Sequence, residues 1–307
     1  MFIASAALCW GISATLGRAA FTGRLFSSGQ TLPPIDPLIL AQSRTTISLL
    51  VLAPILIAIR GWSGMRLPQR DFWRAMLIGV LGVAASNYFY YLAIQKTNVA
   101  TAIILQYTAP VWVLLYMVAR RLQRATVQRM VSIGLALVGI ALVINLFGGG
   151  GLLLNRVGVI AAMLASFSFA CYNVFGGQLV RQYDRWKALV YVLFGTVTFW
   201  LIVNPPWRVV AAHYSGRQWM FLTIFSFTSV LLPFSLYFSG LHHLDPTRAI
   251  ITSCLEPVFS IAIAAVALGE LVGAGQVVGM ILVLAATLMV QMPEKRGEPN
   301  VVLEPME

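Results

Sequence analysis

Apolar stretches recur along the whole chain, separated by short polar segments. A helix of about 20 residues crosses the roughly 30 Å hydrocarbon core of a bilayer, and each of these stretches is close to that length. The chain is therefore predicted to be an all-α membrane protein with ten transmembrane helices. We place these helices at 1–22, 37–59, 71–95, 98–119, 127–147, 156–180, 187–204, 217–241, 246–268 and 273–292.

The ninth predicted helix carries a carboxylate, Glu256, near its middle, and Pro257 follows directly. A weaker copy of this stretch lies 147 residues upstream. The matched positions are Ala102, Ile103, Ile104, Pro110 and Val111 in the first half, and Ala249, Ile250, Ile251, Pro257 and Val258 in the second. We interpret the two halves of the chain as repeats.

Residues 1–148 are assigned to the first five-helix repeat and 152–292 to the second, with a glycine-rich joint at Gly148 to Gly151. Because five is an odd number, two similar halves threaded in succession enter the membrane in opposite orientations. Inverted repeats are common in secondary transporters, where the substrate site lies near the midplane. The predicted fold is two inverted five-helix repeats around a central cavity, followed by a cytoplasmic tail at 293–307.

Composition agrees with a membrane protein, since 59% of the residues are hydrophobic, 10% are charged and the mean hydropathy is +0.83. The net charge of +11 does not indicate nucleic-acid binding, because the basic residues lie between apolar spans. With the N-terminus inside, 14 of the 21 Lys and Arg residues fall on the cytoplasmic side. Both termini are therefore predicted to be cytoplasmic.

Several aromatic and amide side chains interrupt the predicted spans. Amides and phenols facing lipid would be costly, so these groups are expected to point toward partner helices or a cavity. For any one of them, an interhelical hydrogen bond is an equal alternative. As a set they favour a cavity, and aromatic faces would suit an apolar or aromatic substrate. The predicted substrate-binding residues are Trp10, Tyr88, Tyr91, Gln106, Tyr172, Asn173 and Glu256.

Two interpretations of Glu256 remain open. A carboxylate within a span can bind a proton or a substrate ammonium group. Alternatively, it supports the backbone beside Pro257, which cannot donate a hydrogen bond. Arg44, near the outer end of the second span, either extends to the membrane surface or meets a carboxylate at a cavity mouth. His242 and His243 lie beside Asp245 at a turn, where a solvated turn explains them better than a metal site does.

Four segments carry a resemblance to a known family. They are ALCWGISA at 7–14, ATAIILQYTAPVW at 100–112, TRAIITSCLEPVFSIAIAAVALGE at 247–270, and GQVVGMILVLAATLMV from Gly275. The chain resembles the EamA-type, ten-helix branch of the drug/metabolite transporter superfamily. Within it, overall similarity is greatest to bacterial aromatic amino-acid exporters. The acidic residue that often follows the fourth span is absent, and Arg120, Arg121, Gln123 and Arg124 stand there, whereas Glu270 keeps the pattern.

The resemblance implies an inner-membrane secondary transporter that exports amino acids, aromatic or apolar ones above all, by alternating access. A multidrug or nucleotide-sugar transporter is the alternative. Enzymatic activity is not expected, because neither HExxH nor GxSxG occurs, and the chain lacks a Walker loop for ATP. The predicted partners are a small-molecule substrate and the lipid bilayer, with no cofactor or metal. The exact substrate, proton coupling and oligomeric state remain open.

Overall fold

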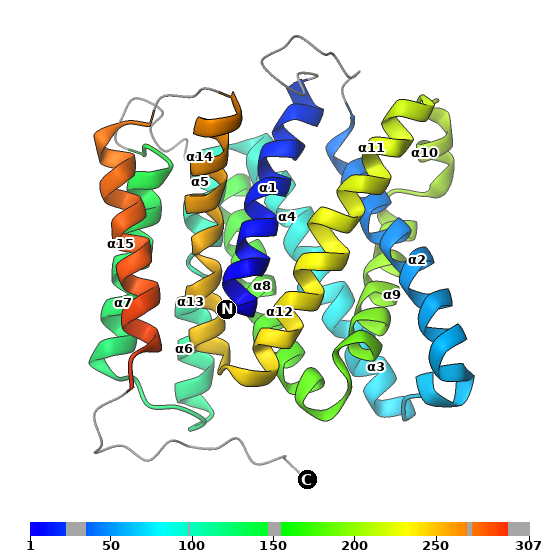
Figure 1. The fold of residues 1–307 in the computed structure, drawn as a ribbon, viewed down its shortest axis with the longest axis horizontal. Helices are drawn as coiled ribbons and strands as arrows, with labels where there is room; N and C mark the ends of the chain where they lie inside the picture. Colours follow the sequence, from blue (N-terminus) through cyan, green and yellow to red (C-terminus); the bar gives the residue numbers. More distant parts are fainter. Residues whose placement is uncertain (23–34, 98, 147–154, 269–271, 294–307) are drawn as a thin grey trace.

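The computed structural model describes residues 1–22, 35–97, 99–146, 155–268 and 272–293. Within these ranges the protein is helical and contains no strand (Figure 1). Eight helical segments are long and apolar enough to cross a membrane, and two shorter apolar helices occupy the first and fifth predicted spans. The glycine-rich joint, Glu270 and the predicted tail beyond residue 293 lie outside the described residues.

The helices follow the predicted spans closely. Their bounds are α1 Phe2–Thr22, α2 Pro37–Met65, α3 Gln69–Leu77, η1 Ile78–Ala84, α4 Ala85–Lys96, α5 Val99–Gln106, α6 Ala109–Ala119, α7 Val127–Val143, α8 Arg156–Gln182, α9 Arg185–Val203, α10 Pro206–Ala211, α11 Gly216–Ser226, η2 Phe227–Leu231, α12 Leu232–His243, α13 Pro246–Ser253, α14 Leu255–Leu268 and α15 Ala274–Gln291.

The second helix was expected to end at 59 but continues to Met65, through a kink at Gly61 where φ is +69°. A positive φ is readily adopted by glycine, so the chain bends there without a steric penalty.

Two helices break where proline follows. The fourth span is interrupted at Tyr107 and Thr108, and the ninth at Cys254, which stands 147 residues after Tyr107. Because proline has no N–H, Pro110 and Pro257 cannot donate to the carbonyls four residues earlier, so the preceding helix ends. Each proline then lies in the first turn of the next helix, where the missing donor costs nothing.

Segments of π-helix interrupt the third and eighth spans at corresponding places. The segments are η1 and η2, and they end at residues 84 and 231, again 147 positions apart. Figure 1 shows that α3 to α4 rises through the molecule whereas α11 to α12 descends, and that α5 to α6 descends whereas α13 to α14 rises. The same irregularities therefore occur twice, in helices that run in opposite directions.

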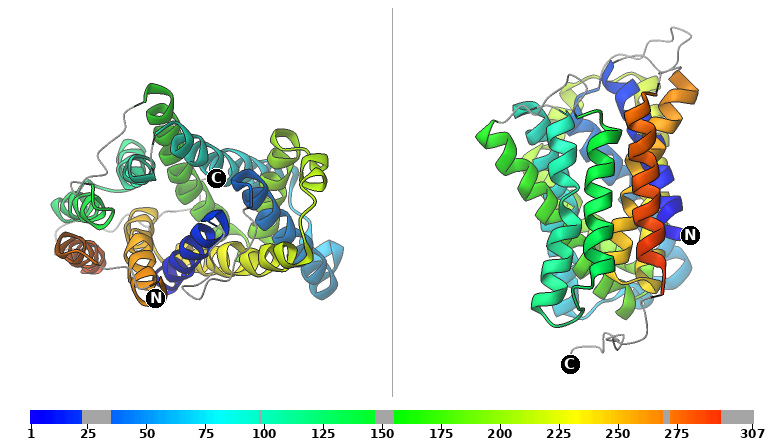
Figure 2. Two further views of the ribbon diagram at one scale, coloured as in Figure 1. Left: turned by 90° about the horizontal axis from the view of Figure 1, so that it is seen from above. Right: turned by 90° about the vertical axis from the view of Figure 1, so that its left-hand side faces the viewer.

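The antiparallel pair α7 and α15 lies side by side at one edge of the molecule (Figures 1 and 2). Their backbones meet at two glycines, since a Cβ added to Gly279 would lie 2.6 Å from the Gly139 carbonyl oxygen. Gln128 at the start of α7 donates to the Met289 carbonyl oxygen at 2.5 Å, near the end of α15. Gln276 at the start of α15 donates to the Val143 carbonyl oxygen at 3.0 Å. Each helix thus satisfies a terminal carbonyl of the other.

Large apolar side chains lie both inside and outside the helical bundle. Trp200, Tyr172, Tyr237 and Phe238 are fully buried, on α8, α9 and α12. Other large apolar side chains are exposed around the outer surface, including Leu50, Ile59, Ile202, Val266 and Leu288. A soluble protein rarely exposes apolar surface on this scale, whereas hydrocarbon accommodates it at no cost. The described chain therefore has the surface of a membrane protein.

Candidate functional site

Glu256 lies in the first turn of α14, directly after the break at Cys254. Its side chain is half-buried, and the carboxylate interacts with the Tyr107 hydroxyl and with the charge of Arg44. Tyr107 occupies the corresponding break between α5 and α6. A carboxylate in a first helical turn also interacts favourably with the helix dipole. The two broken helices, one from each half of the chain, thus bring an acid and a phenol together.

Arg44 reaches this site from the second turn of α2. Its Nη2 donates to the Asn87 side-chain oxygen at 2.5 Å, while the Asn87 amide nitrogen donates to the Val83 carbonyl at 2.7 Å. Asn87 is thereby oriented with its acceptor toward the guanidinium. Of the two interpretations of Arg44, the structure supports the one in which it approaches a carboxylate, because its charge acts on Glu256.

Tyrosines of α4 surround these groups on one side. Tyr90 interacts electrostatically with Glu256, and its ring centroid lies 5.9 Å from that of Tyr91. Tyr88 packs in the other direction, edge-on to Phe199 of α9 with ring centroids 5.9 Å apart. Of the tyrosines predicted to bind substrate, Tyr91 thus packs beside Tyr90, which interacts with Glu256, whereas Tyr88 contacts α9.

Gln106 ends α5, and its amide approaches the Ser86 hydroxyl at 3.5 Å. Ser86 itself donates to the Ala165 carbonyl on α8 at 3.1 Å. Thr108, in the break, shares a 2.9 Å hydrogen bond with Ser166. The broken fourth span is therefore held to α4 and α8 by hydroxyls, while Gln106 remains half-buried beside Tyr107.

Trp10, Tyr172 and Asn173 belong to a separate aromatic cluster. Trp10 packs against Tyr237 at 5.2 Å between ring centroids, and Tyr172 stacks on Tyr237 at 5.9 Å. The Tyr237 hydroxyl donates to the Asn173 side-chain oxygen. Tyr172 and Asn173 are 1% and 0% exposed, so in this conformation they face protein rather than open space. Their role as pocket residues stays a prediction.

The predicted set omitted the groups closest to Glu256. Tyr107 and Tyr90 are absent from the predicted set, and Arg44 was interpreted either as extending to the membrane surface or as meeting a carboxylate. A charge rule would have found Arg44, because a basic and an acidic residue inside apolar spans each require a partner. Aligning Pro110 with Pro257 places Tyr107 at the position of Cys254, two residues before Glu256. The repeat alignment therefore already pointed to Tyr107.

The two buried tyrosine hydroxyls should differ in their contribution to stability. Tyr237→Phe removes the donor to Asn173, which should lower the free energy of unfolding by about 1–3 kcal/mol because a buried acceptor is left unsatisfied. Tyr172→Phe is the matched control, since the Tyr172 hydroxyl is buried without a partner. Thermal unfolding in detergent measures both, and equal melting temperatures for the two variants would contradict the assignment. A transport loss in Tyr172→Phe at unchanged stability would show that substrate uses this hydroxyl.

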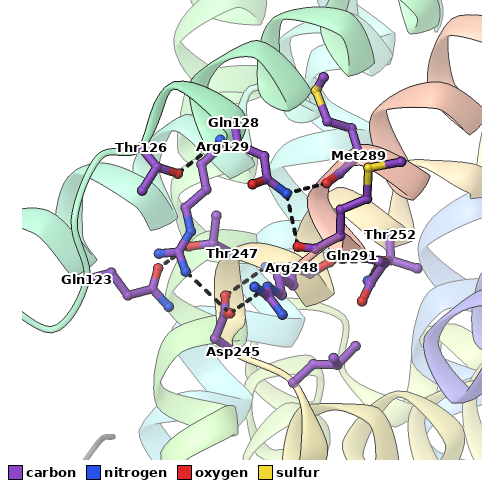
Figure 3. Close-up of polar contacts among 12 residues, drawn as sticks. Gln123, Thr126, Gln128, Arg129, Asp245, Thr247, Arg248, Thr252, Met289 and Gln291 are labelled. Atoms are coloured by element: carbon purple, nitrogen blue, oxygen red, sulfur yellow. Dashed lines mark hydrogen bonds and ion pairs between the residues drawn. The ribbon is translucent and has the colours of Figure 1, made fainter. Parts of the chain in front are cut away.

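A second polar cluster lies at the end of the molecule where α13 approaches α7 and α15 (Figure 3). Asp245 begins α13, and its carboxylate lies 3.8 Å from Arg129 of α7 and 3.3 Å from Arg248. Thr247 donates to Gln123 at 2.8 Å. The Arg129 side chain is 8% exposed, so this ion pair is partly desolvated. The contacts tie the first half of the chain to α13.

Further ion pairs join helices at the same end. Arg60 of α2 lies 2.7 Å from Asp184, which begins α9. The Tyr183 hydroxyl donates to the Asp71 carboxylate at 2.6 Å, and burial together with this acidic partner raises the pKa of Tyr183 to about 12. The hydroxyl therefore remains a donor throughout the physiological pH range.

Throughout the described ranges, no three His, Cys, Asp or Glu side chains are grouped as metal ligands. His242 bonds to the Val180 carbonyl at 3.1 Å, and His243 stacks against Phe2. Both histidines lie in the last turn of α12, and these contacts hold that turn against α8 and α1.

Comparison with known proteins places the chain among transporters. An uncharacterized inner membrane transporter of Salmonella typhimurium, YicL, is 23% identical, and the match covers 83% of this chain and 87% of that protein. A probable amino-acid metabolite efflux pump of the same organism is 24% identical over 55% of this chain and 58% of its own length. An uncharacterized transporter of Archaeoglobus fulgidus is 25% identical, and the match covers 68% of this chain and 75% of that protein.

A solved crystal structure shares the fold, with a TM-score of 0.74 over 94% of this chain and 95% of that one, at 16% identity. The model of the EamA-like transporter family matches the chain twice, at residues 1–145 and at 156–292. The two matches cover nearly all of the sequence, and the protein belongs to the EamA-like transporter family.

Proposed function

We propose that the protein is a secondary transporter of the bacterial inner membrane that exports amino acids, aromatic or apolar ones above all, by alternating access. The observation that carries the proposal is the placement of Glu256 and Arg44. These opposite charges come from different halves of a transporter-family chain and act on one another between broken helices. Discontinuous helices at the interface of two repeats are a common setting for substrate sites in secondary transporters.

An inverted duplication is supported by features that recur at one spacing. The π-helical segments and the proline-associated breaks repeat 147 residues apart, and the helices that contain them run in opposite directions (Figure 1). The separate family matches to the two halves agree with this arrangement. Five helices per repeat would give ten spans, with both termini on the cytoplasmic side, where basic residues are enriched.

A central cavity is supported by side chains that are polar and only half-buried. Arg44, Glu256, Tyr107, Tyr90 and Tyr91 retain accessible surface. They come from α2, α4, α14 and the break between α5 and α6. Electrostatic interactions of Glu256 with Tyr90 and Arg44 support a common region for these side chains. An amino acid there would meet charged groups for its head and aromatic faces for its side chain.

Reconstitution into liposomes tests this function. Vesicles loaded with labelled phenylalanine are expected to release it faster with the protein than without, in a saturable manner, and unlabelled amino acids outside should accelerate exchange. Repeating the assay with and without a pH gradient separates proton-coupled from facilitated transport. Efflux of nucleotide sugars or cationic drugs, with no response to any of the twenty amino acids, would overturn the proposal in favour of the alternative.

Alanine variants at Trp10, Tyr88, Tyr91, Gln106, Tyr172 and Asn173 test the predicted pocket in the same vesicles. Loss of a stacking or hydrogen-bonding group in a pocket is expected to weaken transport about tenfold, equivalent to roughly 1.4 kcal/mol. Unchanged transport in all six variants would remove these residues from the site.

A further inference from the structure

The strongest unassigned feature is a pair of opposite charges, Arg44 and Glu256, that interact electrostatically without forming an ion pair. In the described part of the chain, Arg44 forms a hydrogen bond with Asn87 but no ion pair within 4.0 Å of a carboxylate. Its Nε is buried and has no hydrogen-bond partner. The Glu256 carboxylate interacts with the Arg44 charge without a hydrogen bond, and its hydrogen-bond partner is the Tyr107 hydroxyl.

Keeping two such charges apart inside a membrane protein is costly. Each is half-buried and has lost part of its hydration, and close contact with an opposite charge would compensate for that loss. Arg44 is nevertheless fixed in place, because Asn87 is itself tied to the Val83 carbonyl of η1. The Glu256 carboxylate is held at the start of α14 by its interaction with the Tyr107 hydroxyl. The separation is thus built into the fold, and a bound molecule with its own two charges would satisfy both groups.

We propose that Arg44 and Glu256 bind the two ends of a zwitterion, with the α-carboxylate of an amino acid at Arg44 and its α-ammonium group at Glu256. The inference rests on the proposed function and specifies its substrate class. The unpartnered Nε and a guanidinium N–H can bind a carboxylate in bidentate fashion. The ammonium group would lie between Glu256 and the rings of Tyr90 and Tyr107, where cation–π attraction adds to the ion pair.

This arrangement separates zwitterions from molecules with one charge. An amine without a carboxylate would leave Arg44 unpaired, and an acid without an amine would leave Glu256 unpaired. A site built for a charged group rejects a ligand that lacks the complementary group, because its own polar atoms then stay unsatisfied. A nucleotide sugar, which carries two phosphates, would meet a single arginine and a repelling carboxylate.

The test compares three ligands that share a phenyl ring, using the purified full-length protein in liposomes. Phenylalanine is the zwitterion, phenethylamine lacks the carboxylate, and 3-phenylpropionate lacks the ammonium group. With the unaltered protein, phenylalanine should compete with labelled phenylalanine at least about tenfold better than either analogue, as expected for loss of one charged hydrogen bond.

The variants should change these preferences selectively. Glu256→Gln should abolish the preference for phenylalanine over 3-phenylpropionate, while the preference over phenethylamine persists. Arg44→Gln should do the reverse. Arg44→Lys and Glu256→Asp keep the charges and should retain both preferences, which separates a binding role from a merely structural one. Where a variant is too unstable to reconstitute, its charge-conserving partner, assayed with all three ligands, still decides the question.

The outcomes distinguish the inference from the function on which it rests. No binding or transport of phenylalanine or any other amino acid by the unaltered protein would overturn the proposed function and this inference together. Amino-acid transport with equal affinity for all three ligands would overturn the inference alone. So would a uniform weakening of all three ligands in both glutamine variants.

Discussion

Gly79→Ala is expected to destabilise the protein strongly. Gly79 lies in the first turn of η1, where a Cβ would come 2.1 Å from the Val192 carbonyl oxygen and 2.8 Å from the Thr196 amide nitrogen of α9. Gly195 makes the reciprocal approach, with its Cβ position 2.4 Å from the Met76 carbonyl oxygen. The clashing atoms belong to backbone, so no rotamer change can relieve the overlap, and the two helices must separate.

Separation would also break the hydrogen bond from the Thr196 hydroxyl to the Gly79 carbonyl, which is 3.1 Å long. Overpacking usually costs 1–3 kcal/mol, and we expect at least about 3 kcal/mol here because both partners are rigid. Intrinsic helix propensity acts in the opposite direction, since alanine favours helix over glycine by about 1 kcal/mol. A destabilised variant would therefore show that packing outweighs propensity.

The measurement is the fraction of monodisperse protein that survives heating in detergent, assayed by size-exclusion chromatography. Gly134→Ala on α7 is the matched control, because a Cβ there would meet nothing within 4 Å. That variant should be as stable as the unaltered protein or slightly more so. Equal melting temperatures for Gly79→Ala and Gly134→Ala would mean that α9 and η1 do not approach as closely as described.

Asp245→Asn is expected to open the end of the molecule shown in Figure 3. Asparagine is as good a helix cap as aspartate, so the hydrogen bond that Asp245 accepts from the Arg248 amide at 2.9 Å can persist. The change removes only the charge that faces Arg129 and Arg248. With that attraction lost, α13 is held less firmly and can pivot about the break at Cys254.

The expected shift toward the open state is about 5–30-fold, the ratio that corresponds to one or two kcal/mol. We keep to this range because the Asp245 side chain is 21% exposed, which screens part of the interaction. Maleimide labelling of Cys254 measures the opening, in a protein whose Cys9 and Cys171 are replaced by serine. Cys254 is 1% exposed in the present conformation and should react faster by the same ratio.

Asp184→Asn is the matched control, because Asp184 also caps a helix, at α9, and pairs with an arginine at the same end of the molecule. That pair is 32% and 41% exposed and lies away from α13, so its loss should barely change Cys254 labelling. Arg129→Gln combined with Asp245→Asn should add nothing to the single change. Equal labelling rates in the Asp245 and Asp184 variants would exclude a closing role for the cluster.

Span positions could be predicted from the sequence because hydrocarbon imposes one rule, a continuous apolar run of membrane length. The helix breaks follow from proline chemistry, which is equally local. Pro110 and Pro257 disrupt helical hydrogen bonding whatever surrounds them, and their equivalent places in two similar stretches indicated the duplication. The acidic residue beside the second proline likewise identified one end of the candidate site.

The sequence did not reveal which face of each helix points toward lipid and which toward the interior of the protein. In a soluble protein, polar residues mark the outer face, but in a membrane protein both the lipid-facing and the interior surfaces are apolar, so periodicity carries little information. Tyr172 and Asn173 were grouped with the site from the sequence, and that grouping stays a prediction because in this conformation they pack within an aromatic core. Tyr107 and Tyr90, of the same chemistry, lie beside Glu256.

The chain by itself therefore determined the membrane class, the spans and the acid at the second break, and it indicated the duplication, because these follow from local hydrophobicity and backbone chemistry. Only the tertiary structure decided that Arg44 of α2 faces Glu256 of α14, and that Gly79 and Gly195 bring η1 and α9 into backbone contact. Such pairings depend on how helices rotate and cross, which is set by side-chain packing between segments distant in sequence.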